Sequence, residues 1–423
     1  MYGWKPPKRA LAAEERLSKL IVTPPGRVGR SVRGAVDRQD AVDQSRSAGL
    51  DPDLLDRHEA RVTHTHRRIN AVVVEVSERK RTALERALRK QGCQVERSAP
   101  VAPMLDQSIP QMCVDAAWQL GVTGKDVSIG VADTGVDASH PDLKDRLLAY
   151  EDFTQTDRVD AVGHGTHVCG IIAGAGSHYR GVAPAASLVV AKVLTENGGD
   201  TAGVIAGLSW LSQQGVRAIN VSLGGSGNPN DALSRECEAL VADGIVVCVA
   251  AGNEGPSSHT ISSPGCAPSV ITVGAVDKND TLARYSSRGP VRIGRKTIVK
   301  PDVVAVGGGV AFRDQCLYTT GIVSAKSRKM DKTPCDVAFG RSSRRYVRMS
   351  GTSMATPHVT GVVALLIESA RQQGTPCDPA AIRDILRGSC KKLKYRANEQ
   401  GAGRVDAASA VDLTLKRAAP ACA

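Results

Sequence analysis

Residues 127–133 read VSIGVAD, a nearly continuous apolar run rich in β-branched side chains. Four later segments share this composition: SLVVAKVL (187–194), AINVSL (218–223), GIVVCVAAG (244–252) and SVITVGAV (269–276). Runs of this kind are typical of strands buried on both faces of a sheet. Two helical patterns lie between them: TAGVIAGLSWLSQQG (201–215) and NDALSRECEALVADG (230–244). Buried strands joined by crossover helices predict an α/β fold with a parallel sheet.

The first hundred residues carry a different pattern. Strands are predicted at 16–24, at 62–76 (one or two strands) and at 93–98. Helices are predicted at 29–48 and at 77–92, the second with Ser77 as its N-cap and Gly92 as its end. This order indicates a small α+β unit, followed by a proline-interrupted linker at about 99–110.

Composition excludes several classes of protein. No apolar stretch approaches the ~20 residues that span a bilayer, so no membrane association is expected. The net charge of +12 is concentrated in 1–106, with 21 Lys/Arg against 14 Asp/Glu, and in 313–348, with 9 against 3. Aromatic residues are only 3% of the chain and are not interleaved with the basic ones. Nucleic acid is therefore not expected as a partner.

The cysteines and the N-terminus bear on compartment. Eleven cysteines without a CxxC pair make a zinc ribbon improbable. Cys316 with Cys335, and Cys377 with Cys390, could form disulfides, but the sequence does not decide this. The first fifteen residues lack the apolar segment of a secretory signal. We therefore expect a cytoplasmic protein from the chain as written, or a secreted one if its true start lies upstream.

Three polar clusters follow or precede apolar segments: DTGVDASHPDL from Asp133, GHGTHVCGIIAG around His164 and SGTSMATPHVTGVVALL around Ser353. A hydroxyl nucleophile needs a base to take its proton, and the base needs a third group to fix its tautomer. Serine, histidine and aspartate supply these three parts. A dinucleotide loop, a GxSxG hydrolase motif and a second DTG of an aspartic protease are all absent from the sequence.

These motifs resemble the three signatures of the subtilase family of serine proteases. The order Asp133, His164, Ser353 is also the order of the subtilisin triad. The resemblance implies that Ser353 is the nucleophile, His164 the general base and Asp133 the orienting carboxylate. His167, the second histidine of HGTH, matches a framework position.

The resemblance extends to the substrate cleft. AAGNEG (250–255) matches the oxyanion motif, so Asn253 is expected to donate its side-chain N–H together with the backbone N–H of Ser353. Pro357 is expected in the first turn of the helix that follows Ser353. Two segments are expected to bind an extended peptide and, with small aliphatic walls, to favour an apolar residue before the scissile bond: Ser222, Leu223, Gly224 and Gly225, and Ala250, Ala251 and Gly252.

The N-terminal unit resembles the inhibitory propeptide of this family, which implies self-cleavage between Pro100 and Gln107. No cofactor is required by the resemblance. Gln107 and Asp142 match two calcium ligands weakly, and the loop at 174–184 is too short for the usual calcium site, so calcium is not expected there. The implied division of the chain is as follows: tail 1–16, propeptide-like α+β domain 17–105, subtilisin-like α/β peptidase domain 106–415 with a basic insertion at 309–348, and tail 416–423.

The sequence therefore predicts a serine endopeptidase acting on polypeptides, made as a precursor that its own propeptide inhibits. Two alternatives stay open. The first is a peptide-binding protein of the same fold, locked by its N-terminal domain. The second is a peptide ligase or cyclase that uses the same acyl-enzyme. The insertion at 309–348 is interpreted as a mobile loop in preference to a binding site for an acidic partner.

Overall fold

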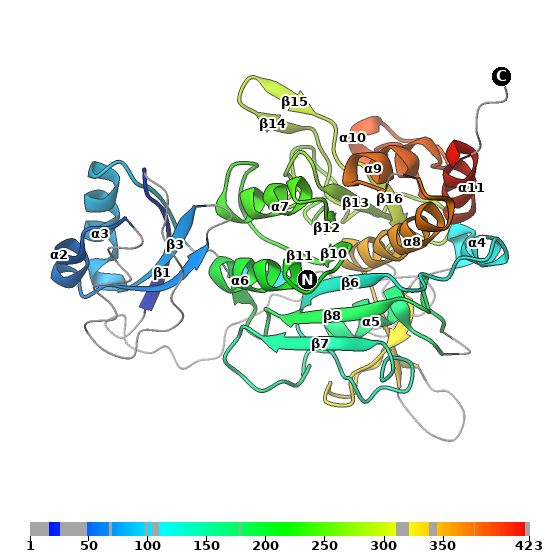
Figure 1. The fold of residues 1–423 in the computed structure, drawn as a ribbon, viewed down its shortest axis with the longest axis horizontal. Helices are drawn as coiled ribbons and strands as arrows, with labels where there is room; N and C mark the ends of the chain where they lie inside the picture. Colours follow the sequence, from blue (N-terminus) through cyan, green and yellow to red (C-terminus); the bar gives the residue numbers. More distant parts are fainter. Residues whose placement is uncertain are drawn as a thin grey trace.

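The computed structural model describes residues 17–25, 49–66, 70–97, 100–103, 110–176, 179–309, 321–337, 345–375 and 377–418. A small N-terminal unit lies at one side of a larger layered part (Figure 1). The strands of the N-terminal unit and its tail are β1 (Leu17–Thr23), β2 (Arg61–His66), β3 (Ala71–Ser77), β4 (Gln94–Arg97) and β5 (Pro100–Pro103), and its helices are α2 (Pro52–Arg57) and α3 (Glu78–Lys90).

The larger part is built on one parallel sheet in the order β16-β13-β12-β10-β6-β8-β7. Its strands are β6 (Ser128–Asp133), β7 (Leu147–Asp152), β8 (Ser187–Lys192), β10 (Ala218–Val221), β12 (Val246–Ala250), β13 (Ile271–Val276) and β16 (Val303–Val306). The major helices are α4 (Val114–Gln119), α5 (His164–Ala173), α6 (Thr201–Ser212), α7 (Ala232–Ala242), α8 (Thr352–Gln373), α9 (Pro379–Gly388), α10 (Ala397–Gln400) and α11 (Ala407–Ala418). The predicted α/β fold with a parallel sheet is confirmed.

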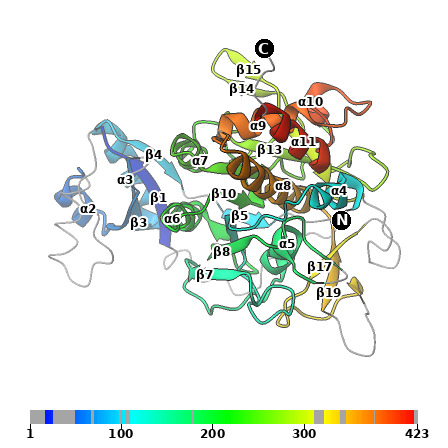
Figure 2. The same ribbon diagram turned by 45° about the vertical axis from the view of Figure 1, so that its right-hand side comes forward.

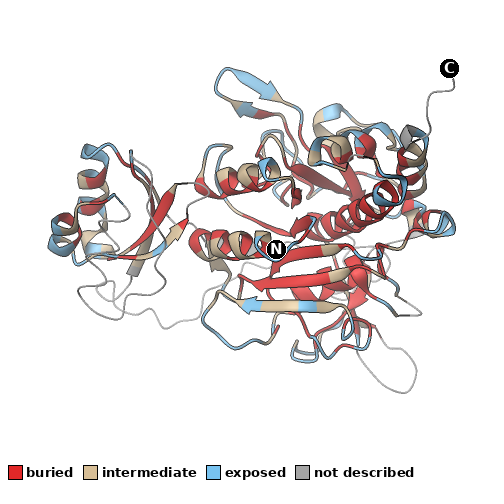
Figure 3. Cartoon of the chain, viewed as in Figure 1, coloured by how far each residue is buried: buried red, intermediate tan, exposed pale blue. Residues whose placement is uncertain are grey.

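Alternate residues of the central strands β6, β8, β10 and β12 enter the two layers of core on either side of this sheet. Ile129 and Val131 of β6 pack with α5 and α8, while Ala132 packs with α6 and α7. Both faces of the central strands are buried, whereas the outer faces of α6 and α7 are partly exposed (Figure 3). The five predicted strands correspond to β6, β8, β10, β12 and β13, and the two predicted helices to α6 and α7.

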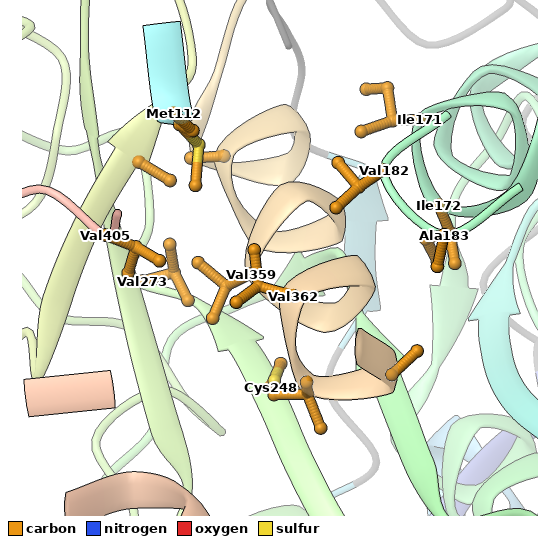
Figure 4. Close-up of a cluster of buried hydrophobic side chains, with 14 of the residues drawn as sticks. Met112, Ile171, Ile172, Val182, Ala183, Cys248, Val273, Val359, Val362 and Val405 are labelled. Carbon is orange, nitrogen blue, oxygen red and sulfur yellow. The ribbon is translucent and has the colours of Figure 1, made fainter. Parts of the chain in front are cut away.

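Helix α8 runs through the core and carries Ser353 near its start. Every residue from Thr352 to Ala370 is buried. Its residues Val359 and Val362 lie beside Val273 of β13 and Cys248 of β12 (Figure 4). Because the helix is packed along this whole length, its N-terminus is held in a fixed place beside the ends of the strands. None of the helices in the described ranges combines the length and hydropathy needed to cross a bilayer.

The N-terminal unit is an antiparallel sheet in the order β2-β3-β1-β4. One face is covered by α2 and α3 through a separate apolar cluster, and the other contributes Ile21 and Ala71 to the core around α6 and α7. The segment 62–76 forms two strands, joined by the turn at Asn70, and the predicted helix at 77–92 is α3. The predicted helix at 29–48 lies outside the described residues, and α2 was not predicted.

Charged side chains join this unit to the larger part. Lys19 Nζ lies 3.0 Å from Asp200 Oδ2, just before α6. Glu96 pairs with Arg235 of α7 at 2.8 Å, and its second oxygen accepts from the backbone N–H of Ala232 at 2.7 Å. That N–H belongs to the first residue of α7, so Glu96 also satisfies a free donor at the helix N-terminus.

Two interpretations of the sequence need correction. The linker at 99–110 contains a strand, β5, which pairs with β11 (Leu223–Gly224) on one side and β9 (Gly199–Asp200) on the other. The described part of the insertion at 309–348 is also a sheet and not a mobile loop. Its strands are β17 (Ile322–Ala325), β18 (Asp336–Val337) and β19 (Tyr346–Met349). A separate hairpin is formed by β14 (Val291–Ile293) and β15 (Lys296–Ile298).

The sequence left two disulfide pairings undecided, and the structure bears on both. Cys377 and Cys390 are free thiols, so this pair is not formed. Cys335 is disulfide-bonded. Cys316, the other member of its candidate pair, lies outside the described residues.

Candidate active site

Asp133 and His164 meet where β6 ends and α5 begins. Oδ1 of Asp133 lies 2.6 Å from Nδ1 of His164, and both side chains are fully buried. The backbone N–H of Thr134 also donates to this oxygen, at 2.7 Å. Since an ionised carboxylate only accepts hydrogen bonds, Nδ1 carries the proton and Nε2 is the basic nitrogen.

The buried carboxylate of Asp160 accepts the hydrogen bonds that fix the turn before His164. Its Oδ1 accepts from the N–H of Gly163 and from Thr134 Oγ1, both at 2.8 Å. Its Oδ2 accepts from the N–H of Thr166 at 2.9 Å and from that residue's hydroxyl at 2.5 Å. Sequence reasoning missed this residue. The available signal was an acidic side chain just before a predicted helix start, where carboxylates satisfy free N–H groups.

His167 lies one turn further along α5 and serves the framework. Burial lowers its pKa to about 3, so the ring is neutral. Its Nε2 lies 3.0 Å from the carbonyl oxygen of Ile322 and 3.2 Å from that of Val347. Ser324 Oγ donates to the carbonyl of His167 at 2.8 Å. The sheet containing β17 and β19 is thereby joined to the helix that begins at His164.

Ser353 is the second residue of α8, which packs against α5. Its hydroxyl donates to the carbonyl oxygen of Ser222 at 3.0 Å. The hydroxyl proton is therefore directed at the carbonyl of Ser222. Catalytic hydrogen bonds often become aligned only when a substrate binds. The first N–H groups of α8 have no partner within the helix and make its start favourable for negative charge.

Asn253 lies in the turn after β12, where Thr352 fixes its amide. The side-chain oxygen of Asn253 accepts from the backbone N–H of Thr352 at 3.0 Å and from its hydroxyl at 3.1 Å. Because the oxygen is held on this side, the amide nitrogen is directed away from Thr352 and is available as a donor. Thr352 was not identified from the sequence as part of the site.

One of the two expected cleft segments pairs along an edge of β5. Leu223 and Gly224 form β11 and pair with Pro103 and Ala102, so the tail of the N-terminal unit occupies the place of an added strand. The opposite wall, β9, was not predicted, because two residues give no periodic signal. β5 is labelled in Figure 2, on the same side of α5 as the N-terminal unit.

The remaining cleft residues follow β12. Ala250 and Ala251 are fully buried, and Gly252 has a φ of +110°. A Cβ at position 252 would lie 2.7 Å from the hydroxyls of both Ser262 and Ser287, so glycine is required by conformation and by space. Gly225 exchanges backbone hydrogen bonds with Ser263 and so anchors the end of the other segment.

Of the two calcium candidates, only Asp142 lies within the described residues. Asp142 Oδ2 accepts from the hydroxyl of Tyr346 at 2.8 Å, and Gln107 lies outside the described ranges. The described residues contain no group of three or more His, Cys, Asp or Glu side chains arranged to hold a metal ion. Asp142 is therefore assigned a structural contact here.

Pro357 is the sixth residue of α8, beyond the first turn in which it was predicted. It lacks the N–H that would donate to the carbonyl of residue 353 in a regular helix. The hydroxyl of Ser222 donates to this carbonyl at 2.8 Å. Asn220 Nδ2 donates in turn to the same hydroxyl at 2.8 Å. Because the proline has no N–H, the carbonyl of Ser353 can accept from Ser222 instead. This hydrogen bond joins the cleft wall to the residue that carries the candidate nucleophile.

Replacing Ser222 by alanine is expected to destabilise the fold by about 1–3 kcal/mol, because a buried carbonyl loses its donor. Adding Pro357→Ala restores an N–H at that carbonyl and should recover most of the loss. Urea unfolding of the single and double variants, in a Ser353→Ala background that prevents self-digestion, measures the coupling. If the changes in the free energy of unfolding of the two single variants simply add in the double variant, the proposed exchange of hydrogen-bond donors is contradicted.

Comparison with known proteins agrees with the geometry. The sequence model of the subtilase family matches residues 124–403. The chain is 38% identical to serine protease AprX of Bacillus subtilis (strain 168) over 318 residues, which cover 69% of this chain and 67% of AprX. It is 35% identical to subtilisin DY of Bacillus licheniformis over 273 residues, 63% of this chain and 85% of that protein. The major intracellular serine protease of Bacillus subtilis (strain 168) is 35% identical over 277 residues, 62% and 75% of the two chains.

Proposed function

Because the chain belongs to the subtilase family of serine proteases and is a serine-type endopeptidase, we propose that Asp133, His164 and Ser353 are its catalytic triad. The observation that carries this assignment is the 2.6 Å bond between two fully buried side chains, His164 and Asp133. A buried imidazole held in one tautomer by a carboxylate is what a serine nucleophile needs as its base.

In the proposed reaction Ser353 Oγ attacks the scissile carbonyl carbon while Nε2 of His164 takes the hydroxyl proton. The negative oxygen of the tetrahedral intermediate accepts from the Asn253 amide and from the N–H of Ser353 at the start of α8. His164 then gives its proton to the leaving amine, and an acyl-enzyme ester remains on Ser353. A water molecule gives a proton to His164 and attacks the ester, and His164 then returns this proton to Ser353 Oγ as the acid is released. These reaction steps assign every proton transfer to a side chain of the protein and require no cofactor.

The bound polypeptide is proposed to add a strand to the cleft wall formed by residues 222–225. Support comes from β5, which already pairs with β11 in this way. Residues 250–252 form the second wall, around the side chain that precedes the scissile bond. Their small, buried side chains favour an apolar residue at that position.

We propose in addition that the N-terminal unit is an intramolecular inhibitor which the protein removes by self-cleavage. β5 runs antiparallel to β11, and Pro103 lies opposite Leu223, the residue after Ser222, whose carbonyl accepts from the hydroxyl of Ser353. A cleavage site between Pro100 and Gln107 follows from this pairing. The ion pairs of Lys19 and Glu96 hold the unit in place while its tail fills the cleft.

Labelling with a fluorophosphonate tests the assignment of the nucleophile. The reagent is expected to add one phosphonyl group to Ser353, since phosphonylation needs the activated hydroxyl and the oxyanion site together. Peptide mapping by mass spectrometry locates the adduct, and the His164→Ala variant should remain unlabelled. An adduct on any other serine, or labelling that survives His164→Ala, would contradict the proposed triad.

A further inference from the structure

A cavity of about 340 Å³ lies beside the loop that carries His164. Three segments line it, residues 136–139, 158–160 and 327–329. Asp160 bonds to the N–H of Gly163, and Asp137 accepts from the N–H of Arg328 at 2.8 Å. A Cβ added to Gly163 would lie 2.6 Å from the sulfur of Met330, so the residue that follows segment 327–329 packs directly against the residue before His164.

The cavity lies on the side of His164 away from the N-terminal unit. Neither β9 nor β11, the two walls of the strand occupied by β5, contributes a lining residue. Figures 1 and 2 place the sheet containing β17 and β19 beyond α5 as seen from the N-terminal unit. A polypeptide that enters along β11 and passes Ser353 therefore leaves the site on the side of this cavity.

The negative charges of the cavity are satisfied within the protein. Asp137 is buried and accepts from the N–H and the hydroxyl of Ser139, at 3.0 and 2.6 Å, and from the N–H of Arg328. Burial raises its pKa, but these hydrogen bonds outweigh burial and leave the pKa below its ordinary value. Asp160 is also buried, and its oxygens are bonded to Thr134, Gly163 and Thr166.

The positive charges face solvent. The side chain of Arg328 is 68% exposed and reaches Asp137 only at 3.8 Å. Lys329 is exposed, and no ion-pair partner for its ammonium group is found in the described part of the chain. Arg158 is held in place by a bond to the carbonyl of Tyr150, with its guanidinium 5.1 Å from that ring's centre. The open surface of the cavity is thus cationic.

We propose that this cavity is a subsite for acidic side chains of the substrate on the leaving-group side of the scissile bond. The inference rests on the proposed function, because it takes Ser353 as the point of cleavage. The basic segment 313–348 supplies two of the three cations and so has a role in substrate choice. An extended chain advances about 3.3 Å per residue, so the four positions after the scissile bond span about 13 Å and are the ones proposed to meet these cations.

Two quenched fluorescent peptides test the proposal, identical up to the cleaved bond and carrying Glu or Gln at the four positions after it. With the expressed full-length chain, after any self-cleavage, kcat/KM for the Glu peptide is expected to be about tenfold higher at low ionic strength. At 0.5 M NaCl the ratio should fall toward one, because exposed charges are screened. A ratio of one at low salt would overturn the proposal.

The double variant Arg328→Ala/Lys329→Ala is expected to abolish the preference while changing the rate on the Gln peptide by less than about twofold. The backbone N–H that bonds Asp137 is retained in this variant. Lys332→Ala is the control for a general loss of positive charge, since it removes one positive charge from an exposed position of the same segment outside the cavity. A preference that survives the double variant, or that Lys332→Ala reduces equally, would refute the subsite.

The outcomes also separate this proposal from the one on which it rests. Ser353-dependent hydrolysis of both peptides at equal rates removes the acidic subsite and leaves the triad standing. Hydrolysis of neither peptide, or hydrolysis unaffected by Ser353→Ala, contradicts the proposed function and the subsite with it.

Discussion

Ser353→Ala is expected to lower peptide hydrolysis by about 10⁶-fold, the size of the loss when the serine of such a triad is removed. The same change should keep the chain at full length, while the wild type loses roughly its first hundred residues. Both results have one cause, because the hydroxyl that attacks substrates also attacks the bond between the N-terminal unit and the rest of the chain. Intact mass and activity of the two purified proteins measure them together.

Two controls make the result specific. Ser350→Ala removes a hydroxyl three residues earlier, which bonds to the carbonyl of Gly309, and should be processed like the wild type. The Ser353→Ala protein should also be cut by added wild-type enzyme between Pro100 and Gln107, and survive as a folded product. Complete digestion instead would show that the variant is misfolded.

Other outcomes would favour the alternatives. Full-length chains in both proteins, with no peptide hydrolysis by the wild type, would support a fold locked by its N-terminal unit. Joining of an added amine nucleophile to the acyl group in preference to hydrolysis would support a ligase. Self-cleavage that continues in Ser353→Ala would contradict two assignments: Ser353 as the nucleophile, and the N-terminal unit as an inhibitor that Ser353 removes.

The central strands were predictable because they carry their own signal. Small apolar and β-branched residues predominate in β6 and β12, since both faces of each strand are covered. Strand β7 was missed because it lies at the edge of the sheet and is half-exposed, so its residues show no continuous apolar run. Strand β5 was missed because it begins and ends with proline. Its partners among the described residues, β9 and β11, are distant in the sequence.

The candidate site divides in the same way. Asp133, His164 and Ser353 stood out from the residue types that the chemistry needs and from their neighbours in the sequence. The hydrogen bonds that orient them did not, because Thr352, Asp160 and Ser222 are ordinary turn or strand-end residues until the fold brings them to their partners. Pro357 was predicted in the first turn of α8 but lies beyond it. A proline is accommodated there because the carbonyl it leaves without a donor accepts from Ser222, 135 residues earlier in the chain.

Asn253→Ala is expected to reduce kcat by about 10²–10³-fold with little change in KM, a range for which subtilisin is the reference case. The amide nitrogen has no charge to bind until the tetrahedral oxygen forms, so its loss raises the barrier without weakening substrate binding. Steady-state kinetics on a peptide substrate with an apolar residue before the scissile bond measures kcat and KM separately. A large rise in KM with unchanged kcat would place Asn253 in substrate binding instead.

Two further variants test whether the orientation of this amide matters. In Asn253→Asp the side chain keeps its shape and can still accept from Thr352, but it presents an oxygen where the nitrogen stood, so the loss should equal or exceed that of alanine. Thr352→Ala removes the hydroxyl at 3.1 Å and keeps the backbone N–H at 3.0 Å, so the amide is held by one bond in place of two. A smaller loss, about tenfold, is expected because the donor remains but is less well fixed. If Thr352→Ala lost as much as Asn253→Ala, the hydroxyl itself would have to act on the oxyanion, and the amide would no longer be the principal donor.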